Sequence, residues 1–482
     1  MFLFLACAAA FPLSLPLLYW WLQPPRNFAP GLPVVPLWIA FLPLLRSWLG
    51  FPLPGQDETY ARYVEPLMAQ HGAVVIYFGS QWNVLVACPQ GMKQLFSLER
   101  TTFQKQGNHR KLPNAAISAL TGGNIISETG ALWRKYAQII RPSLKDDTDP
   151  SKLDIAAERL IAQLEGHAGS VTGLVQRYSM EAFLPSPPAI HRIHALVKRH
   201  IFHPLFLSVP ALDRFPRLFP SRAIARNLIG NLEVELLKAL PGAEARLKLG
   251  LPANEKDESG NVQSKLDGAF LSGFLSEREY IDNVKSETGP RPKLTAVLFI
   301  AGHENAQQAL LSLLWILSRD PELQARIRSD ASPSPILHAT VLEALRLYPP
   351  IPQLFNRRIA HDTVLSLPGL DVSLKEGTYV GWSAYGLHRS IDAEWRPQRW
   401  GSSIEEMDAN LRRWRSEGQF ATFHGGLRTC PGQPFALASL HCVIRAILRV
   451  YEVTLSSEEG TQLTPGGLMA PRDLKLHFGK RP

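Results

Sequence analysis

The chain has 482 residues, of which 45% are hydrophobic and 19% charged, and this is the composition of an ordinary globular protein. Its formal net charge of +9 is scattered along the chain, and no basic run carries interleaved aromatic residues, which excludes nucleic acid as an expected partner. Four cysteines without CxxC pairing or regular spacing argue against a disulfide scaffold or a structural zinc site and favour a reducing compartment. These cysteines are Cys7, Cys88, Cys430 and Cys442.

The first 25 residues contain no charged side chain, and Arg26 is the first one. The run MFLFLACAAAFPLSLPLLYWWL supplies about the twenty apolar residues that a membrane-crossing helix needs. Trp20 and Trp21 followed by Arg26 are typical of an interfacial aromatic belt and a cytosolic positive charge. A cleaved signal peptide is the alternative, but this run has no basic start and is long for one. Residues 1–25 are therefore predicted to form a transmembrane anchor.

Residues 26–55 form a proline-rich segment between this anchor and the rest of the chain. Residues 27–45 within it contain four prolines and no charge, which is typical of a stiff linker. Its apolar part either rests on the membrane surface or packs as a loop on the following domain, and the sequence favours neither alternative. Residues 56–482 are predicted to form one catalytic domain.

Helical patterns dominate the rest of the chain, with a few short strands between them. The runs AVVIYFG and NVLVAC, within residues 73–88, predict a β-hairpin. Residues 294–320 predict a long helix that is apolar nearly all round, which implies burial through the middle of the domain. The polar stretch 252–289 predicts an exposed loop or short surface helices, and residues 349–365 predict proline-directed turns and strands. The predicted fold class is therefore mainly α with a minor β-sheet.

The stretch FHGGLRTCPG, residues 423–432, places Cys430 among three glycines and directly before an apolar helical period. At a helix N-terminus the dipole and the free N–H groups stabilise a thiolate. A nucleophilic role needs an oriented base, which the sequence does not show, and a single thiolate cannot hold zinc. It can hold an iron whose other ligands come from a porphyrin, and Arg428 could then bind a haem propionate with two hydrogen bonds.

The same stretch fits the pattern FxxGxRxCxG at each fixed position, and it resembles the cysteine loop of the cytochrome P-450 family, the haem-thiolate monooxygenases. The run EALR, ending at Arg346, matches the family's ExxR motif, and PQRW, residues 397–400, is similar to its PERF segment apart from Gln398. The matches follow the family order along nearly the whole chain. The resemblance implies an ion network that specifies the haem-side architecture. Its members would be Glu343, Arg346 and Arg399.

The run AGHEN, residues 301–305 on the long helix, resembles the segment that crosses the haem in the family. The resemblance implies that Glu304 and Asn305 are the catalytic residues on the oxygen-binding side. Asn305 replaces the usual threonine, and its amide can position a water but cannot relay a proton as simply as a hydroxyl. Gly302 either leaves room for a ligand at the iron or makes a helix–helix packing contact.

Two further segments resemble the parts of the family that bind the haem propionates. GALWRKYAQIIRPSL implies a propionate contact from Trp133. The basic residue usual four positions later is Ala137 here, with Arg134 or Arg141 as substitutes. NRRIAHDTVL implies a second contact, from Arg357. The cofactor-binding residues implied are Cys430 as the metal ligand, with Arg428, Phe423, Gly426, Trp133 and Arg357.

The resemblance implies a single large catalytic domain of the cytochrome P-450 fold behind the membrane anchor, with heme b whose iron is bound axially by Cys430. Electrons would come from NADPH through a reductase, an acidic partner that suits the basic excess of this chain. The microsomal type of the family implies an endoplasmic reticulum membrane location with the catalytic domain in the cytosol. The residues implied around the substrate are Ala301, Ile351, Leu354 and Phe355.

The predicted function is a monooxygenase that oxidises a hydrophobic small molecule with O₂, similar to fungal members that tailor secondary metabolites. Two alternatives stay open. The first is a haem-thiolate isomerase or dehydratase, or an oxidative ring-closure or coupling enzyme, that inserts no oxygen. The second is a non-catalytic haem-binding membrane protein, which the replacement of threonine by Asn305 keeps in consideration.

Overall fold

The structure is a computed structural model that describes residues 23–146, 150–167, 169–183, 188–203, 205–206, 209–238, 294–457 and 461–481. Residues 1–22 of the predicted anchor and the whole polar stretch 252–289 lie outside these residues, so what the sequence predicts for them stays a prediction. Within the described ranges, no helix is both long enough and apolar enough to cross a bilayer.

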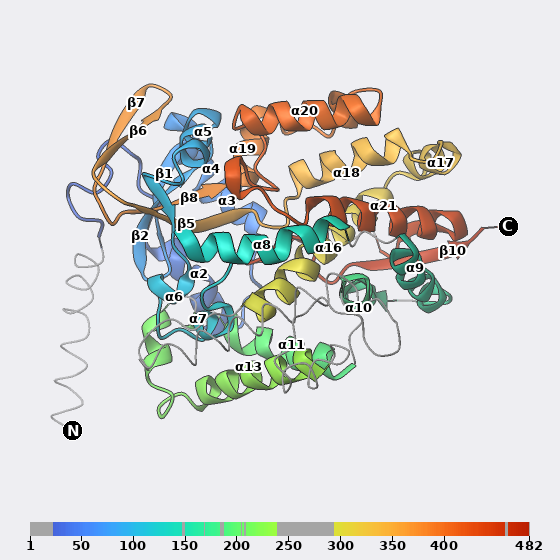
Figure 1. Cartoon of the computed structure of the whole chain (residues 1–482), viewed down its shortest axis with the longest axis horizontal. Coiled ribbons are helices and arrows are strands. Elements are labelled where there is room, and N and C mark those ends of the chain that lie inside the picture. Colours follow the sequence, from blue (N-terminus) through green and yellow to red (C-terminus); the bar gives the residue numbers. More distant parts are fainter. Residues whose placement is uncertain are drawn as a thin grey trace.

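Helices dominate the described residues, and the sheets are minor, which confirms the predicted fold class. Most strands gather at one end of the molecule (Figure 1). The α-helices are α2 Trp38–Trp48, α3 Gln56–Tyr63, α4 Glu65–His71, α5 Pro89–Ser97, α6 Asn108–Lys111, α7 Ala116–Thr121, α8 Gly130–Asp146, α9 Pro150–Leu164, α10 Thr172–Phe183, α11 Pro188–Ile201, α13 Pro220–Lys238, α16 Leu294–Leu317, α17 Pro321–Ser329, α18 Pro335–Leu347, α19 Ala384–Ile391, α20 Ile404–Ser416 and α21 Gln433–Val450. Three 3₁₀-helices are η1 Pro210–Arg214, η2 Pro397–Trp400 and η3 Gly426–Arg428.

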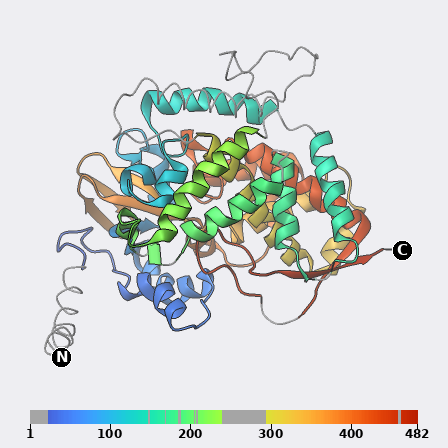
Figure 2. The ribbon, with the colours of Figure 1, turned by 90° about the horizontal axis from the view of Figure 1, so that it is seen from below.

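Helix α16 crosses the middle of the molecule, with α11 and α13 on one side and α18 and α20 on the other (Figure 1). Seen from below, α11 and α13 cover the face of the helical part (Figure 2). The helix contacts α10, α18 and α21, and Leu310, Leu313, Leu314 and Leu317 are buried in the main core. An apolar surface on all sides is stable only when it is buried on all sides, and this confirms the long internal helix that the sequence predicts.

The main sheet has five strands in the order β1-β2-β8-β5-β3. Strands β1 and β2 pair antiparallel and confirm the predicted hairpin. Its turn is Gly79–Ser80, and both residues have positive φ angles, 60° and 61°, as the tight turns of twisted hairpins require. Two smaller sheets have the orders β4-β10-β9 and β6-β7. The strands are β1 Ala73–Phe78, β2 Gln81–Val86, β3 Phe103–Lys105, β4 Gly169–Ser170, β5 Gln353–Ile359, β6 Thr363–Leu367, β7 Leu370–Leu374, β8 Tyr379–Ser383, β9 Tyr451–Leu455 and β10 Lys475–Lys480.

The proline-rich segment 26–55 begins by packing on the sheet. The backbone N–H of Val35 donates to the carbonyl of Val75 at 2.8 Å, and five apolar side chains between residues 29 and 39 are buried. The end of helix α2 and the residues after it leave large apolar side chains in solvent, with Trp48 80% exposed and Phe51 58% exposed. The first part of the segment therefore takes the domain-packed alternative, and the second part presents an apolar surface.

Candidate active site

The loop before α21 has a backbone path that demands glycine. At Gly426 the φ angle is +65°, and an added Cβ would lie 2.9 Å from the carbonyl oxygen of Phe96. At Gly425 an added Cβ would lie 2.4 Å from the Phe96 ring. The loop closes with the N–H of Cys430 donating to the carbonyl of Phe423 at 2.9 Å. Close packing on α5 therefore fixes where the cysteine sits.

Cys430 lies three residues before the start of α21, as the sequence predicts, and its side chain opens into a cavity although it lies deep in the protein. Burial raises the pKa of the Cys430 thiol above its ordinary value, and this outweighs the backbone groups of Gly432 and Gln433 and the charge of Arg415. The backbone groups before the helix therefore stabilise a thiolate, as the sequence predicts, but burial has the larger effect. A metal cation at Sγ would remove the proton, because coordination deprotonates a thiol outright.

The cavity has a volume of about 240 Å³ and lies between α8, α16, β5 and the cysteine loop. Most of its lining side chains are apolar. Three of the four residues predicted around a substrate line it, namely Ala301, Ile351 and Leu354. Phe355 does not, and this prediction is corrected: its ring stacks on Phe78 with centroids 4.6 Å apart. Successive side chains of a strand point to opposite faces, so Leu354 and Phe355 of β5 cannot both face the cavity.

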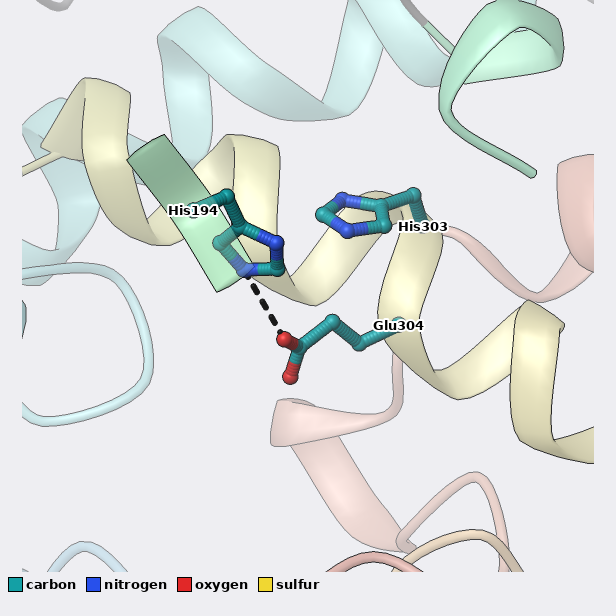
Figure 3. A group of neighbouring side chains, drawn as sticks. All are labelled: His194, His303 and Glu304. Atoms are coloured by element: carbon teal, nitrogen blue, oxygen red, sulfur yellow. Dashed lines mark ion pairs between the residues drawn. The ribbon is translucent and has the colours of Figure 1, made fainter. Parts of the chain in front are cut away.

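The two predicted catalytic residues point in different directions. Asn305 lines the cavity, with its Nδ2 atom 3.5 Å from the carbonyl of Ala301 one turn earlier on α16. Glu304 turns toward α11, where its Oε1 atom lies 3.0 Å from His194 Nε2 (Figure 3). The same oxygen lies 2.9 Å from Lys198 Nζ. Burial alone would raise the pKa of Glu304, but His194 and Lys198 lower it to about 2. Glu304 of α16 is therefore ionised, and its carboxylate faces α11 rather than the cavity.

Gly302 serves helix packing. An added Cβ would lie 2.1–2.5 Å from three atoms of the Phe183 ring, which comes from α10. Gly302 also lines the cavity beside this ring. Of the two explanations left open by the sequence, the structure favours the packing contact, because the closest neighbour is a protein side chain.

A cluster of cations lies at one end of the cavity. Lys105 of β3 and Arg357 of β5 are direct partners in the antiparallel pairing, and both are buried. Arg428 lines the cavity and donates to the carbonyl of Ile125 at 2.7 Å. Glu99 is the carboxylate in contact with the cluster: it lies 3.2 Å from Arg357 Nη2 and accepts from the N–H of Arg428 at 3.1 Å. Like charges directly opposite on paired strands are destabilising, so an anion bound beside this cluster would stabilise it.

The pKa directions agree with an excess of positive charge. Burial lowers the pKa of Lys105 well below its ordinary value, and Arg357 and Arg428 lower it further. Burial also lowers the pKa values of Arg357 and Arg428 to about 10 each. His424 contacts Arg357 Nη2, and burial with the charge of Lys105 keeps its ring neutral by lowering its pKa. Arg141 also lines the cavity and acts on Arg428, so the basic side chains at this end outnumber the single carboxylate Glu99.

Lys105 is a basic residue that lines the cavity, whereas the position on α8 where the family usually has one is Ala137. Of the two substitutes considered from the sequence, Arg134 is exposed, and Arg141 stacks on Trp133 and donates to the carbonyl of Leu427 at 2.8 Å. Trp133 also lies 4.7 Å from the Arg428 guanidinium carbon. The signal for Lys105 in the sequence is weak: a lysine at the inward position of a three-residue strand, two residues after the buried Phe103.

The predicted ion network is assembled as the motif spacing implies. Arg346 donates to both carboxylate oxygens of Glu343, at 2.9 and 2.8 Å. Arg399 Nε donates to Glu343 Oε1 at 3.1 Å, and Trp400 Nε1 donates to Oε2 at 3.1 Å. The Glu343 and Arg346 side chains are both 0% exposed. Arg346 further donates to the carbonyls of His388 and Glu394, so the network ties α18 to the chain before the cysteine loop.

The comparison with known proteins decides the family. Over 93% of this chain and 86% of the relative, the sequence is 31% identical to the cytochrome P450 monooxygenase xanG of Aspergillus fumigatus. This chain belongs to the cytochrome P450 family. The P450 is also 30% identical to cytochrome P450-DIT2 of Saccharomyces cerevisiae, over 95% of this chain and 94% of that one. The family model named Cytochrome P450 matches residues 292–478.

The fold of this P450 is shared with solved members of the family. The retinoic acid-bound cyanobacterial CYP120A1 superposes with a TM-score of 0.64 at 17% identity, covering 88% of this chain and 94% of that one. The heme domain of cytochrome P450DA also gives a TM-score of 0.64, at 18% identity. At this identity the likeness concerns the fold alone. By its family the P450 is a monooxygenase, and the family uses haem iron with a cysteine thiolate.

The residues of this P450 fit that cofactor. Haem carries two propionate groups, and the excess of basic side chains around Lys105, Arg357 and Arg428 suits two negative charges. The Cys430 side chain opens into the same cavity, and apolar side chains of α8 and α16 line its walls. The cavity is lined by four of these residues, Arg428, Trp133, Phe423 and Lys105. Arg357 is the pairing partner of Lys105 on the neighbouring strand. Gly426 allows the tight backbone turn of the cysteine loop.

Replacing Lys105 with methionine tests the charge match in two opposite directions. We expect the haem-free protein to become more stable, because a buried cation without a partner is removed. We expect haem release to become at least about tenfold faster, because the loss of one charge-assisted hydrogen bond to a propionate costs roughly 1.5–3 kcal/mol. Unfolding of haem-free protein and transfer of haem to an excess of a haem-binding acceptor measure the two effects. The exposed Arg134→Met is the control and should change neither quantity.

Proposed function

We propose that this P450 oxidises a hydrophobic small molecule at a haem held by the Cys430 thiolate, with O₂ and with NADPH-derived electrons delivered by a reductase. The observation that carries the proposal is the cavity itself: Cys430 and Asn305, from two separate elements, line one space whose other walls are mainly apolar. An apolar pocket with a few convergent polar groups is the usual form of a small-molecule site.

Different residues around the cofactor would bind different parts of it. Haem bound here would supply an iron that activates O₂, and a thiolate ligand favours O–O cleavage by donating electron density. Cys430 would be the axial ligand. Lys105 and Arg428 would pair with the propionates, Arg357 would support Lys105 from the neighbouring strand, and Trp133 would cover the same edge. The network of Glu343, Arg346 and Arg399 would keep the loop in place.

Asn305 and Glu304 would manage protons on the opposite side. The amide of Asn305 lies in the cavity and can hold a water by both donating and accepting. The carboxylate of Glu304 is next to it on α16 and contacts Lys198, whose side chain is 30% exposed. A proton from solvent would reach the water at Asn305, and the ionised Glu304, whose pKa is about 2, would favour that transfer by its negative charge. This arrangement replaces the hydroxyl that the family usually places at residue 305.

The cellular setting is part of the same proposal. The predicted anchor of residues 1–25 and the exposed apolar side chains Trp48 and Phe51 near the end of α2 support attachment to the endoplasmic reticulum membrane, with the domain in the cytosol. The net charge of +9 suits an acidic reductase. The role in fungal secondary metabolism is part of the proposal, and similarity to a P450 monooxygenase of the fungus Aspergillus fumigatus is consistent with it.

A three-step assay tests the function. The reduced protein with carbon monoxide should give the thiolate Soret band. A set of apolar compounds should then be screened for a Soret shift, and the hits incubated with reductase, NADPH and labelled O₂. Product carrying the label supports the proposal. Turnover without NADPH would indicate the isomerase or dehydratase, and NADPH-dependent product without label would indicate ring closure or coupling.

Replacing Asn305 with leucine should uncouple the enzyme. NADPH consumption should continue, whereas product per NADPH should fall about tenfold, a loss of about 1.4 kcal/mol in the productive step. The reason is that leucine fills the same space but cannot hold a water. Asn305→Thr should restore most of the product. The control is Gln308→Leu, an amide of α16 that does not line the cavity. Equal product per NADPH in the wild type and Asn305→Leu would contradict this role.

A further inference from the structure

Three metal-ligating side chains form a buried cluster between α11 and α16. His194 comes from α11, and His303 and Glu304 come from α16 (Figure 3). One nitrogen of each imidazole and one carboxylate oxygen lie within 4.8 Å of one another, and all three side chains are buried. Figure 3 shows both rings and the carboxylate turned toward a common space. None of the three lines the haem cavity.

His303 is held in the tautomer that a metal ligand needs. Its Nδ1 atom lies 2.7 Å from the carbonyl oxygen of Phe299, and since a carbonyl can only accept, the proton is on Nδ1. The ring then carries a lone pair on Nε2, and this atom is buried without a hydrogen-bond partner. Histidine ligands of metals are commonly oriented in this way, by donating from the second nitrogen to a backbone carbonyl.

His194 and Glu304 meet at the same place. His194 Nε2 lies 3.0 Å from Glu304 Oε1, but the two atoms lack the alignment of a hydrogen bond, and both ring nitrogens of His194 are buried without a hydrogen-bond partner. Buried polar atoms nearly always form hydrogen bonds, so several ring nitrogens in one place that form none require an explanation. An ion that accepts their lone pairs is one such explanation.

We propose that the His194–His303–Glu304 cluster binds a divalent transition metal ion of the zinc type. Two imidazoles and one carboxylate are a known ligand set for zinc, whose bonds of about 2.0–2.2 Å hold tetrahedral ligands roughly 3.3–3.6 Å apart. The separations here, 3.0 Å for His194–Glu304 and at most 4.8 Å in the group, approach that geometry through side-chain rotation. Mg²⁺ and Ca²⁺ prefer oxygen ligands and fit less well.

Lys198 sets how tightly the ion binds. Its ammonium lies 2.9 Å from Glu304 Oε1, one turn after His194 on α11, and its side chain is 30% exposed. A metal ion and an ammonium cannot share that oxygen, so binding must move Lys198 toward solvent, which a partly exposed side chain can do. The ion would then join α11 to α16, the helix that lines the haem cavity.

Zinc uptake by the haem-loaded full chain tests the site. In the haem-loaded protein Cys430 is the ligand of the haem iron, so its thiolate does not compete with the cluster for zinc. The protein is dialysed against ZnCl₂, and bound zinc is counted by elemental analysis and titrated by calorimetry. We expect one zinc per chain from this site, at least tenfold weaker binding in His303→Gln, and at least tenfold tighter binding in Lys198→Met. The control is His441→Gln, since His441 lies 3.3 Å from His338 in a different histidine pair and should not affect this zinc.

Two results would overturn the site. One is wild-type enzyme that takes up no more zinc than His303→Gln. The other is Lys198→Met that binds zinc no more tightly than the wild type, since a purely structural ion cluster predicts this result. If His303→Gln does not load haem, Glu304→Gln, which keeps the side-chain size, serves as the same comparison. No turnover is measured, so failure of the zinc site and failure of the proposed function are distinguishable.

Discussion

Replacing Cys430 with alanine should abolish both the thiolate Soret band of the reduced, carbon monoxide-treated protein and all product formation. The Cys430 side chain opens into the cavity beside the residues proposed to bind haem, and no other thiol lines this cavity within the described residues. Without this ligand the iron loses the electron donation that favours O–O cleavage. The expected loss of activity is to the background of the assay, because the step depends on this one bond.

The matched control for this variant is Cys442→Ala. Cys442 is a half-buried thiol on α21 that donates to Asp154 at 3.2 Å and does not line the cavity. Its variant should keep the Soret band and the activity. A Cys430→Ala protein that still binds haem, gives the thiolate band and forms product would refute the ligand assignment.

Glu343→Ala should cost about 3–5 kcal/mol of unfolding free energy, because it leaves the fully buried Arg346 without a counter-charge. The Arg399 and Trp400 donors to Glu343 lose their acceptor as well. Such a loss is a large part of the 5–15 kcal/mol that stabilises an ordinary domain. We therefore expect little folded protein and little bound haem, measured by denaturant unfolding and by haem content.

The control for Glu343 is Glu158→Ala, which breaks an exposed ion pair with Arg449. Exposed pairs contribute at most about 1 kcal/mol, so this variant should unfold close to the wild type. If Glu343→Ala loses no more stability than Glu158→Ala, the network is not structural. A stable Glu343→Ala protein that fails to load haem would instead place the network in cofactor assembly.

Local sequence patterns were sufficient to predict features that are determined by residues close together in the chain. The apolar helix at residues 294–317 and the hairpin at residues 73–86 are each set by the period of their side chains. The pair Glu343 and Arg346 shares one helix face because three residues make almost one turn. Gly426 is required by a turn in its own loop, although its clash partner comes from α5.

Sequence patterns were wrong or undecided where the outcome depends on the direction of a side chain or on its neighbours in the fold. The sequence placed Phe355 in the substrate pocket, but strand alternation in β5 turns it to Phe78. It predicted that the helix N-terminus stabilises a thiolate at Cys430, and those backbone groups do lower the pKa of the thiol, but burial raises it by more. It left Gly302 open, and the ring of Phe183 from α10 decides that position. Each outcome depends on a neighbour distant in the chain.

The sequence by itself determined the family, the cysteine loop, the ion-network motif and the mainly helical class, because these depend on residue types at short, fixed spacings. Only the tertiary structure decided that Lys105 lies opposite Arg357, that Glu304 turns to His194 and Lys198, and that His303 joins them. Strand register and helix facing bring together residues that are up to 252 positions apart in the chain. Whether a buried charge destabilises the fold depends on the charged and polar groups within a few ångströms of it. The effect of these residues on stability can therefore be judged only when such partners are known.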